Sequence, residues 1–131
     1  MNRQMLKSKI HRARITGSDL HYVGSITIDP DLLEAGDIHE FEQVAVVDID
    51  NGARFETYTI AGERGSGEMK VNGAAARLVH RGDTIIVISY GGYDPDDLEH
   101  YHPRVVHVDA HNQIMQIDGA VATLLGASTV A

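Results

Sequence analysis

The sequence predicts a mainly β protein whose short strands close into a barrel. Apolar and polar residues alternate from Met5 to Ile15, and an Asn51-Gly52 pair separates two segments rich in β-branched residues. Turn-forming residues recur between further short apolar segments, a pattern typical of barrels and sandwiches. A chain of 131 residues can bury one sizeable core, whereas two cores would each be marginal. We therefore expect a single domain over residues 1–131.

The first part of the chain is expected to form a strand, a second short strand and a helix. Alternation over residues 5–15 places one set of polar side chains on one face of the strand, namely Lys7, Lys9 and His11. Residues 25–28 begin the next strand. A short helix follows, with its N-cap, its first helical position and its stop at Asp29, Pro30 and Gly36.

The middle of the chain is expected to form a hairpin and a second short helix. Residues 44–49 and 53–60 flank Asn51-Gly52, the strongest short signal for a β-hairpin. Asn72-Gly73 begins another turn, and the alanine-rich stretch to Val79 predicts a helix that ends near residues 81–83.

The last part of the chain is expected to contain three strands. Residues 84–90 are apolar enough for a buried strand, and residues 91–97 are expected to form an acidic loop. Two final strands are expected at residues 105–108 and 113–117. Residues 119–131 are small and apolar, which is consistent with a docked or frayed tail.

Composition excludes several classes of function. The formal net charge of −8 opposes nucleic-acid binding, and the absence of cysteine excludes disulfides and thiolate chemistry. No segment approaches the ~20 apolar residues that span a bilayer, and no signal peptide is evident, so we expect a cytoplasmic protein without a membrane partner. Five of the 11 basic residues lie near the start of the chain, at Arg3, Lys7, Lys9, Arg12 and Arg14. These residues either meet an anion or pair with acidic neighbours.

Gly24-Ser25 has the chemistry of a self-cleaving peptide bond. A serine hydroxyl can attack the carbonyl carbon of the preceding residue, and glycine leaves that carbon unhindered by a Cβ atom. The resulting ester can break by β-elimination and hydrolysis, which leaves a pyruvoyl group at position 25. The expected products are residues 1–24 and residues 25–131.

Five segments, in their order and spacing, resemble the aspartate 1-decarboxylase family. The resemblance extends from about Met5 to about Pro103, and its segments are Lys7-Ser-Lys-Ile-His-Arg12, Asp19-Leu-His-Tyr-Val-Gly-Ser25, Asn51-Gly-Ala-Arg-Phe-Glu-Thr-Tyr58, Gly62-Glu-Arg-Gly-Ser-Gly67 and Val71-Asn-Gly-Ala-Ala-Ala76. It implies a six-stranded double-psi β-barrel, which assembles as a homotetramer with active sites at subunit boundaries. It also implies decarboxylation of L-aspartate to β-alanine and CO2 through a Schiff base on the pyruvoyl group of Ser25. The product feeds the synthesis of pantothenate and coenzyme A.

The resemblance assigns most of the site residues. Lys9 and Arg54 bind substrate, and Tyr58 protonates the carbanion. Thr57 takes part in processing and contacts substrate, although alternation predicts that it faces away from Arg54, so a bulge or a strong twist would be needed. Two cations suit a substrate with two carboxylates, and the sequence does not decide which cation takes which carboxylate.

The remaining predicted site residues surround the reacting bond. Asn72 and the amides of the following small residues, Gly73, Ala74 and Ala75, can stabilise an oxyanion or hold substrate. The same residues would also form an ordinary turn. His11 and Tyr22 match family positions that line the pocket. Val47 stands where some members carry tryptophan, which changes the pocket wall but removes no reacting group.

Other patterns are better explained without a ligand. The histidines near Pro103, at positions 100, 102, 107 and 111, predict a polar surface rather than a metal site. Residues 62–67 lack the Gly-Lys-Ser/Thr ending of a phosphate loop and predict a structural turn. Two rival functions stay open, a pyruvoyl decarboxylase for another amino acid and an unprocessed barrel that acts as a binding or structural module. The need for a maturation partner also stays open.

Overall fold

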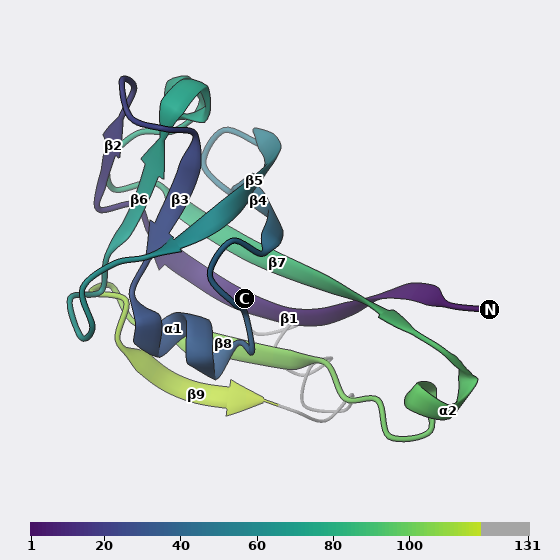
Figure 1. Ribbon diagram of the computed structural model, residues 1–131. Coiled ribbons are helices and arrows are strands. Elements are labelled where there is room, and N and C mark those ends of the chain that lie inside the picture. The colour runs from purple at the N-terminus through teal and green to yellow at the C-terminus, as the bar shows by residue number, and fades with distance from the viewer. Residues whose placement is uncertain (119–131) are drawn as a thin grey trace.

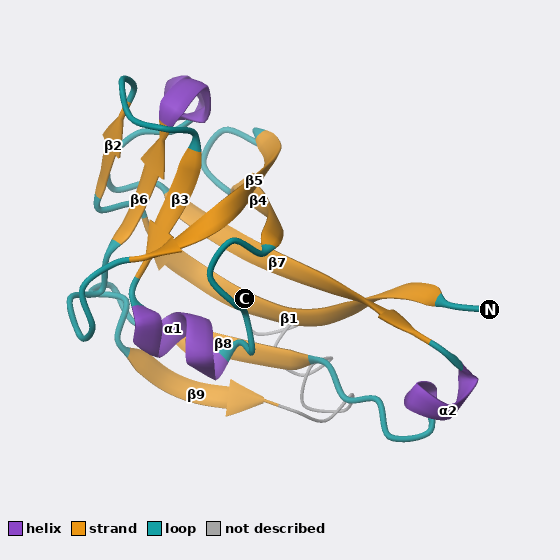
Figure 2. Cartoon of the chain, in the orientation of Figure 1, coloured by secondary structure: helices purple, strands orange, loops and turns teal. Residues whose placement is uncertain are grey.

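The protein is mainly β, as the sequence predicts (Figure 2). The computed structural model describes residues 1–118, and the tail expected at 119–131 lies outside the described residues. The strands are β1 (Arg3–Arg14), β2 (Gly17–Asp19), β3 (Ser25–Ile28), β4 (Gln43–Asp48), β5 (Arg54–Ala61), β6 (Met69–Asn72), β7 (Thr84–Tyr93), β8 (Arg104–Val108) and β9 (Ile114–Asp118). The described residues therefore form nine strands, three more than the six that the family resemblance implies.

All nine strands join one mixed sheet in the order β2-β6-β3-β5-β4-β7-β1-β8-β9. The pairs β1–β8, β2–β6 and β3–β5 are parallel, and the other neighbours are antiparallel. Figure 1 shows β1 and β7 lying side by side along the length of the molecule, with β2, β3 and β6 gathered at one end. The sheet is curled, consistent with the predicted barrel.

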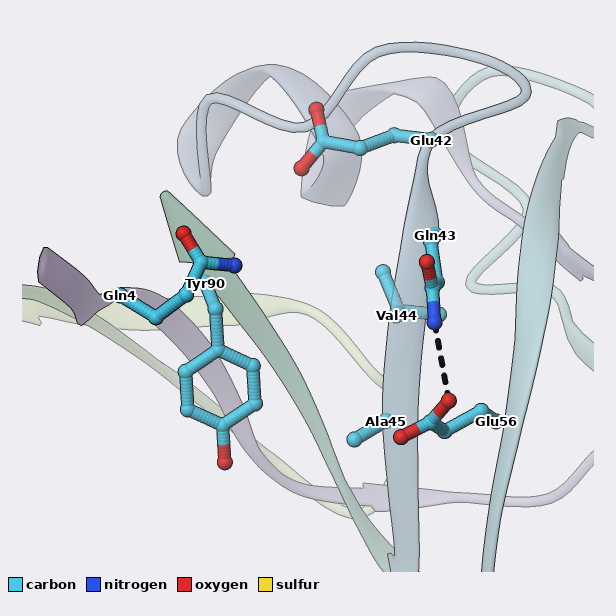
Figure 3. Close-up of a pocket in the computed structure, with 7 residues that line it drawn as sticks. All are labelled: Gln4, Glu42, Gln43, Val44, Ala45, Glu56 and Tyr90. Carbon is cyan, nitrogen blue, oxygen red and sulfur yellow. Dashed lines mark hydrogen bonds between the residues drawn. The ribbon is translucent and has the colours of Figure 1, made fainter. Parts of the chain in front are cut away.

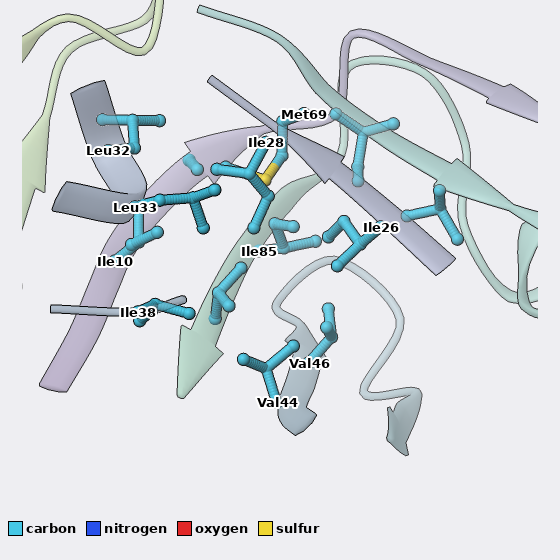
Figure 4. Close-up of a cluster of buried hydrophobic side chains, with 14 of the residues drawn as sticks. Ile10, Ile26, Ile28, Leu32, Leu33, Ile38, Val44, Val46, Met69 and Ile85 are labelled. Atoms are coloured by element: carbon cyan, nitrogen blue, oxygen red, sulfur yellow. The ribbon is translucent and has the colours of Figure 1, made fainter. Parts of the chain in front are cut away.

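The inner face of this sheet holds the hydrophobic core. Ile10, Val87 and Val46 form one row across β1, β7 and β4, and all three side chains are fully buried. Ile26 and Ile28 of β3 join the same cluster (Figure 4). Burying one such aliphatic side chain stabilises the fold by roughly 1.5–3 kcal/mol. Burial of this cluster is therefore the main contribution to the stability of the curled sheet.

The first strand follows the predicted alternation. Ser8 and Ile10 are buried, whereas Lys9 and His11 are half-buried and lie on the opposite face of β1. Lys7 lies at a shift in the β1–β7 register, where its Nζ forms an ion pair with Glu42 at 2.9 Å. For Lys7, the interpretation as a strand cation that pairs with an acidic neighbour is therefore confirmed.

The predicted first helix is present as α1 (Pro30–Ala35), with Asp29 as its N-cap. Asp29 is buried, and its Oδ1 accepts a hydrogen bond from the Asp31 amide at 2.8 Å. The same carboxylate also accepts from the amides of Gly65 and Gly67, at 3.1 and 2.8 Å. One buried side chain thus fixes both the helix start and the 62–67 loop, which confirms the prediction of a structural turn there.

We expect Asp29→Ala to lower the free energy of unfolding by about 3 kcal/mol, because it removes a helix cap and leaves three amides, the buried one of Gly67 among them, without an acceptor. Chemical denaturation measures the change. Asp31→Ala is the matched control, since Asp31 pairs with Arg64 at the surface and its loss should cost less than about 1 kcal/mol. Equal losses in the two variants would contradict the assigned role of Asp29.

The structure corrects the prediction of an acidic loop at 91–97. Strand β7 continues to Tyr93, because Gly91 and Gly92 pair with Met5 and Gln4 of β1. Asp94 then caps the short helix α2 (Pro95–Leu98) through a capping box with Asp97. Pairing with a distant strand therefore outweighs the loop preference of the two glycines.

The second predicted helix is a 3-10 helix, η1 (Gly73–Leu78), which directly follows β6. The predicted hairpin is formed by β4 and β5, and the two final strands are β8 and β9. None of the helices in residues 1–118 is long and apolar enough to cross a membrane.

Candidate active site

Ser25 is the first residue of β3, and its hydroxyl is buried and held from two sides. Its Oγ donates a hydrogen bond to the Val23 carbonyl at 3.0 Å and accepts one from Asn72 Nδ2 at 3.0 Å. Only 1% of Ser25 is exposed. Within residues 1–118, neither hydrogen-bond partner of the Ser25 hydroxyl is a titratable group. The hydroxyl is thus oriented and shielded from water without contact to a side-chain base.

Asn72 lies directly opposite Ser25 in the antiparallel β3–β6 pair. Its Nδ2 also donates to Thr27 Oγ1 at 3.0 Å, and its side chain makes no capping bond to η1. Asn72 is 1% exposed, and its buried Oδ1 has no hydrogen-bond partner within residues 1–118. Buried amide oxygens are rarely left unpaired. Asn72 therefore offers an unused acceptor beside the serine hydroxyl.

Gly73 packs against the backbone of Gly24. It adopts a φ of +79°, and a Cβ atom at this position would lie 2.6 Å from Gly24 Cα and 2.9 Å from Gly24 N. A Cβ atom on Gly24 itself would meet nothing within 4 Å. The close contact fixes the Gly24 backbone from one side and leaves its other side open.

Tyr58 lies level with Ser25 on the neighbouring strand. The parallel β3–β5 register pairs Ile26 with Thr59, so the preceding residues, Ser25 and Tyr58, share the opposite face. Within the described residues, the Tyr58 hydroxyl forms no hydrogen bond, and its ring lies 6.4 Å from that of Phe41. A half-buried phenol without a partner is available to donate a proton to a neighbouring group.

Thr57 lies on the other face of β5, as the alternation predicts. It pairs with Val44, a core residue, and the β4–β5 register runs from Arg54 to Tyr58 without a shift. The bulge that would have turned Thr57 toward Arg54 is therefore absent from this pairing. Thr57 can approach the site only from the inner side of the sheet.

Arg54 and Lys9 share the outer face of the sheet, but they lie on strands that are not neighbours. Arg54 is exposed on β5, opposite Val47 of β4, while Lys9 lies on β1. Neither cation forms an ion pair with a residue in the described part of the chain, so both are available for an anion. Two strands separate β5 from β1, which places their backbones roughly 14 Å apart along the sheet.

His11 lies on β1, where it pairs with His107 of β8. Its ring meets that of His107 edge to face at 5.5 Å between centroids, and His107 Nε2 lies 2.6 Å from Asp118 Oδ2. Burial lowers the pKa of the His11 imidazole below its usual value, and the nearby positive charges of His107 and two other basic residues lower it further. This shift favours the neutral form of the His11 imidazole.

Tyr22 is exposed in the loop before Gly24, and Lys70 Nζ lies 5.6 Å from the centroid of its ring. This is within the range of a cation–π contact. Sequence reasoning missed Lys70, and it missed Thr27 as the second acceptor of Asn72. Thr27 follows Ser25 by two residues, so strand alternation could have placed both on one face. Lys70 lies on β6, a strand that the sequence analysis did not predict, and so its contact with the Tyr22 loop could not be inferred.

Two hollows mark the outer face of the sheet near Arg54. One has a volume of about 220 Å³ and is lined by Arg54, Glu56 and Tyr90, among others. The adjoining hollow measures about 270 Å³ and shares Glu56 and Tyr90 (Figure 3). Figure 3 shows Gln43 Nε2 donating a hydrogen bond to Glu56 Oε2, at 2.9 Å. Both hollows are open and large enough for a small amino acid.

A family model described as aspartate decarboxylase matches residues 1–115. The chain belongs to the aspartate decarboxylase family. It is therefore a carboxy-lyase, and its reaction is the decarboxylation of aspartate. The match covers every residue named at the site except Asp118, and it confirms the resemblance seen in the sequence. In this chain Gly24, Ser25, Tyr58, Asn72 and Gly73 lie together, whereas Lys9 and His11 lie on β1, which two strands separate from β5.

Proposed function

We propose that this aspartate decarboxylase cleaves its own Gly24–Ser25 bond and uses the pyruvoyl group formed from Ser25. The observation that carries the proposal is the buried hydroxyl of Ser25, which is held by Asn72 while Gly73 fixes the Gly24 backbone. The residues fit such a group, because the unpaired Asn72 Oδ1 and the Gly73 contact form a small cradle around position 25.

Cleavage would proceed in three steps on this chain. Ser25 Oγ attacks the Gly24 carbonyl carbon and displaces the Ser25 nitrogen, which exchanges the amide for an ester. Loss of the Ser25 Cα proton then expels the Gly24 carboxylate and leaves a dehydroalanine. Water hydrolyses this residue with release of ammonia, and the pyruvoyl group is left at the start of residues 25–131.

The ketone of the pyruvoyl group supplies an electron sink for the decarboxylation. Arg54 binds a substrate carboxylate through two parallel hydrogen bonds, since its guanidinium is exposed and unpaired within the described residues. Tyr58 lies level with Ser25 and returns a proton to the carbon that lost CO2. The backbone amides of Gly73, Ala74 and Ala75 hold substrate from the side of η1.

We also propose a homotetramer in which the site lies at a subunit boundary. The supporting observation is the separation of Lys9 from Arg54 by two intervening strands within one protomer. A second protomer could place its own Lys9 and His11 against Ser25 and Arg54. The product β-alanine would enter pantothenate synthesis in the cytoplasm.

Intact-mass spectrometry of the purified protein tests the proposal. We expect residues 1–24 and residues 25–131 as separate masses, the larger being lighter by one ammonia than a chain that begins with serine. The processed protein should release CO2 and β-alanine from L-aspartate and react much more slowly with glutamate or alanine. Faster reaction with another amino acid would assign a different substrate.

One intact chain after prolonged warm incubation, with no CO2 released from aspartate, would contradict self-cleavage. If cleavage then appeared on addition of a cell extract, a maturation partner would be required. If it did not, the chain would be an unprocessed barrel that acts as a binding or structural module.

A further inference from the structure

Three aspartates meet where the β4–β5 hairpin turns beside the start of β7. Asp48 ends β4, Asp50 lies in the turn, and Asp83 directly precedes β7. One carboxylate oxygen from each lies within 4.8 Å of the others. This spacing is close enough for one ion to contact all three. The cluster is separate from the Ser25 site and plays no part in the reaction described above.

Backbone amides hold each carboxylate through one of its oxygens. Asp48 Oδ1 accepts from the Asp50 amide at 2.9 Å. Asp50 Oδ2 accepts from the Thr84 amide at 2.8 Å, and Asp83 Oδ2 accepts from the His80 amide at 2.9 Å. The three side chains are thus fixed in position, and no N–H group in residues 1–118 donates a hydrogen bond to the second oxygen of any of them.

The buried oxygen of Asp48 points to a missing ligand. Asp48 is 0% exposed, and its Oδ2 has no hydrogen-bond partner in residues 1–118. No lysine or arginine in residues 1–118 forms an ion pair with the cluster, and the exposed His80 imidazole lies 4.0 Å from Asp83. Burial raises the pKa of Asp48, and its pairing with the neighbouring Asp83 carboxyl raises it further.

We propose that Asp48, Asp50 and Asp83 bind one divalent cation that prefers oxygen ligands, either Ca²⁺ or Mg²⁺. Carboxylate oxygens are the ligands that these hard cations prefer, and the cluster offers none of the nitrogen or sulfur ligands favoured by zinc. Asp50 is exposed, so water molecules can complete the coordination. A divalent charge would also compensate the buried Asp48 carboxylate.

The cation would join two segments that are distant in sequence, the β4–β5 turn and the start of β7. It would tie the end of β4 to the start of β7, and Asn51 Nδ2 already links the same turn to η1 by donating to the Leu78 carbonyl at 2.8 Å. Arg54 begins the strand that leaves this turn. The expected result of binding is therefore a more stable hairpin.

The test is a thermal-denaturation titration of the metal-free full-length protein with CaCl2 or MgCl2 alone. We expect a saturable rise in Tm of about 4 °C or more. Asp48→Asn and Asp50→Asn should each abolish the rise, since asparagine keeps the amide contacts but removes a charged ligand. Asp96→Asn, which changes an exposed acid on α2, is the control and should keep it.

No rise in Tm with either cation up to about 10 mM, above the weakest class of protein calcium sites, would overturn the proposal. So would an equal rise in both cluster variants and the wild type, because the cation would then bind elsewhere. Asp50→Asn keeps the test decisive if Asp48→Asn does not fold, since Asp50 is exposed. The readout is stability, so its outcome is independent of self-cleavage at Ser25.

Discussion

Ser25→Ala is expected to leave one uncleaved chain of 14.3 kDa and to reduce aspartate decarboxylation at least about 1,000-fold. Alanine lacks the hydroxyl that attacks the Gly24 carbonyl, so neither the ester nor the pyruvoyl group can form. The fold should persist, because Ser25 contributes only two side-chain hydrogen bonds and no core volume. Intact mass and CO2 release from aspartate measure the two effects.

The matched control is Ser18→Ala. Ser18 is an exposed serine in β2 and its side chain makes no hydrogen bond to a described residue, so cleavage and activity should both match the wild type. Decarboxylation at the wild-type rate by uncleaved Ser25→Ala protein would contradict the proposal that a pyruvoyl group formed from Ser25 is the cofactor. The family assignment would survive that result, since it rests on the sequence match.

Gly73→Ala is expected to slow cleavage about 100-fold, because displacing the reacting groups by about 1 Å has an effect of this size. Its Cβ atom would lie 2.6 Å from Gly24 Cα, so either the Gly24 backbone or the start of η1 must move. The variant also carries alanine at a φ of +79°, which costs roughly 1–2 kcal/mol of stability by itself.

Gly82→Ala separates these two effects. Gly82 has a φ of +90°, and a Cβ atom there would meet nothing within 4 Å, so this variant carries the backbone cost without the contact to Gly24. Cleavage is followed by mass spectrometry over time, and stability by chemical denaturation. The Gly73 contact would have no role in processing if both variants lost similar stability and cleaved at the wild-type rate.

The elements that the sequence predicted well are those set by neighbouring residues. Asn51-Gly52 determines its hairpin through the turn that it favours, and Asp29 and Pro30 start α1 where a cap and a first helical proline are expected. These signals act over a few residues and need no knowledge of the rest of the fold. Their physical cause is therefore readable from the chain alone.

The elements that the sequence did not predict depend on remote partners. β2 and β6 have three and four residues, and they form because they pair with each other and because β6 also pairs with β3. Gly91 and Gly92 become strand residues for the same reason, through β1. Short strands and glycines carry weak local preferences, so tertiary pairing decides their conformation.

The candidate site divides in the same way. Gly24-Ser25 and Asn72-Gly73 were found from residue types and family resemblance, and the structure brings both pairs together. The aspartate cluster was missed, since Asp83 is far from Asp48 in sequence and no spacing rule connects them. Lys9 and His11 were correctly expected on one face of their strand, but the sheet order that separates Lys9 from Arg54 could not be read from alternation.

The position of β1 has a consequence for the cleaved protein. β1 lies inside the sheet, paired with β7 on one side and β8 on the other, and β2 is paired with β6. Breaking the chain after Gly24 would therefore leave residues 1–24 bound as a peptide that completes the sheet of the larger fragment. Unfolding would then separate two molecules, and recovery of the native state would depend on protein concentration. The uncleaved precursor would fold as one chain, independently of protein concentration. The mature enzyme would keep the same fold because its two fragments stay paired in one sheet.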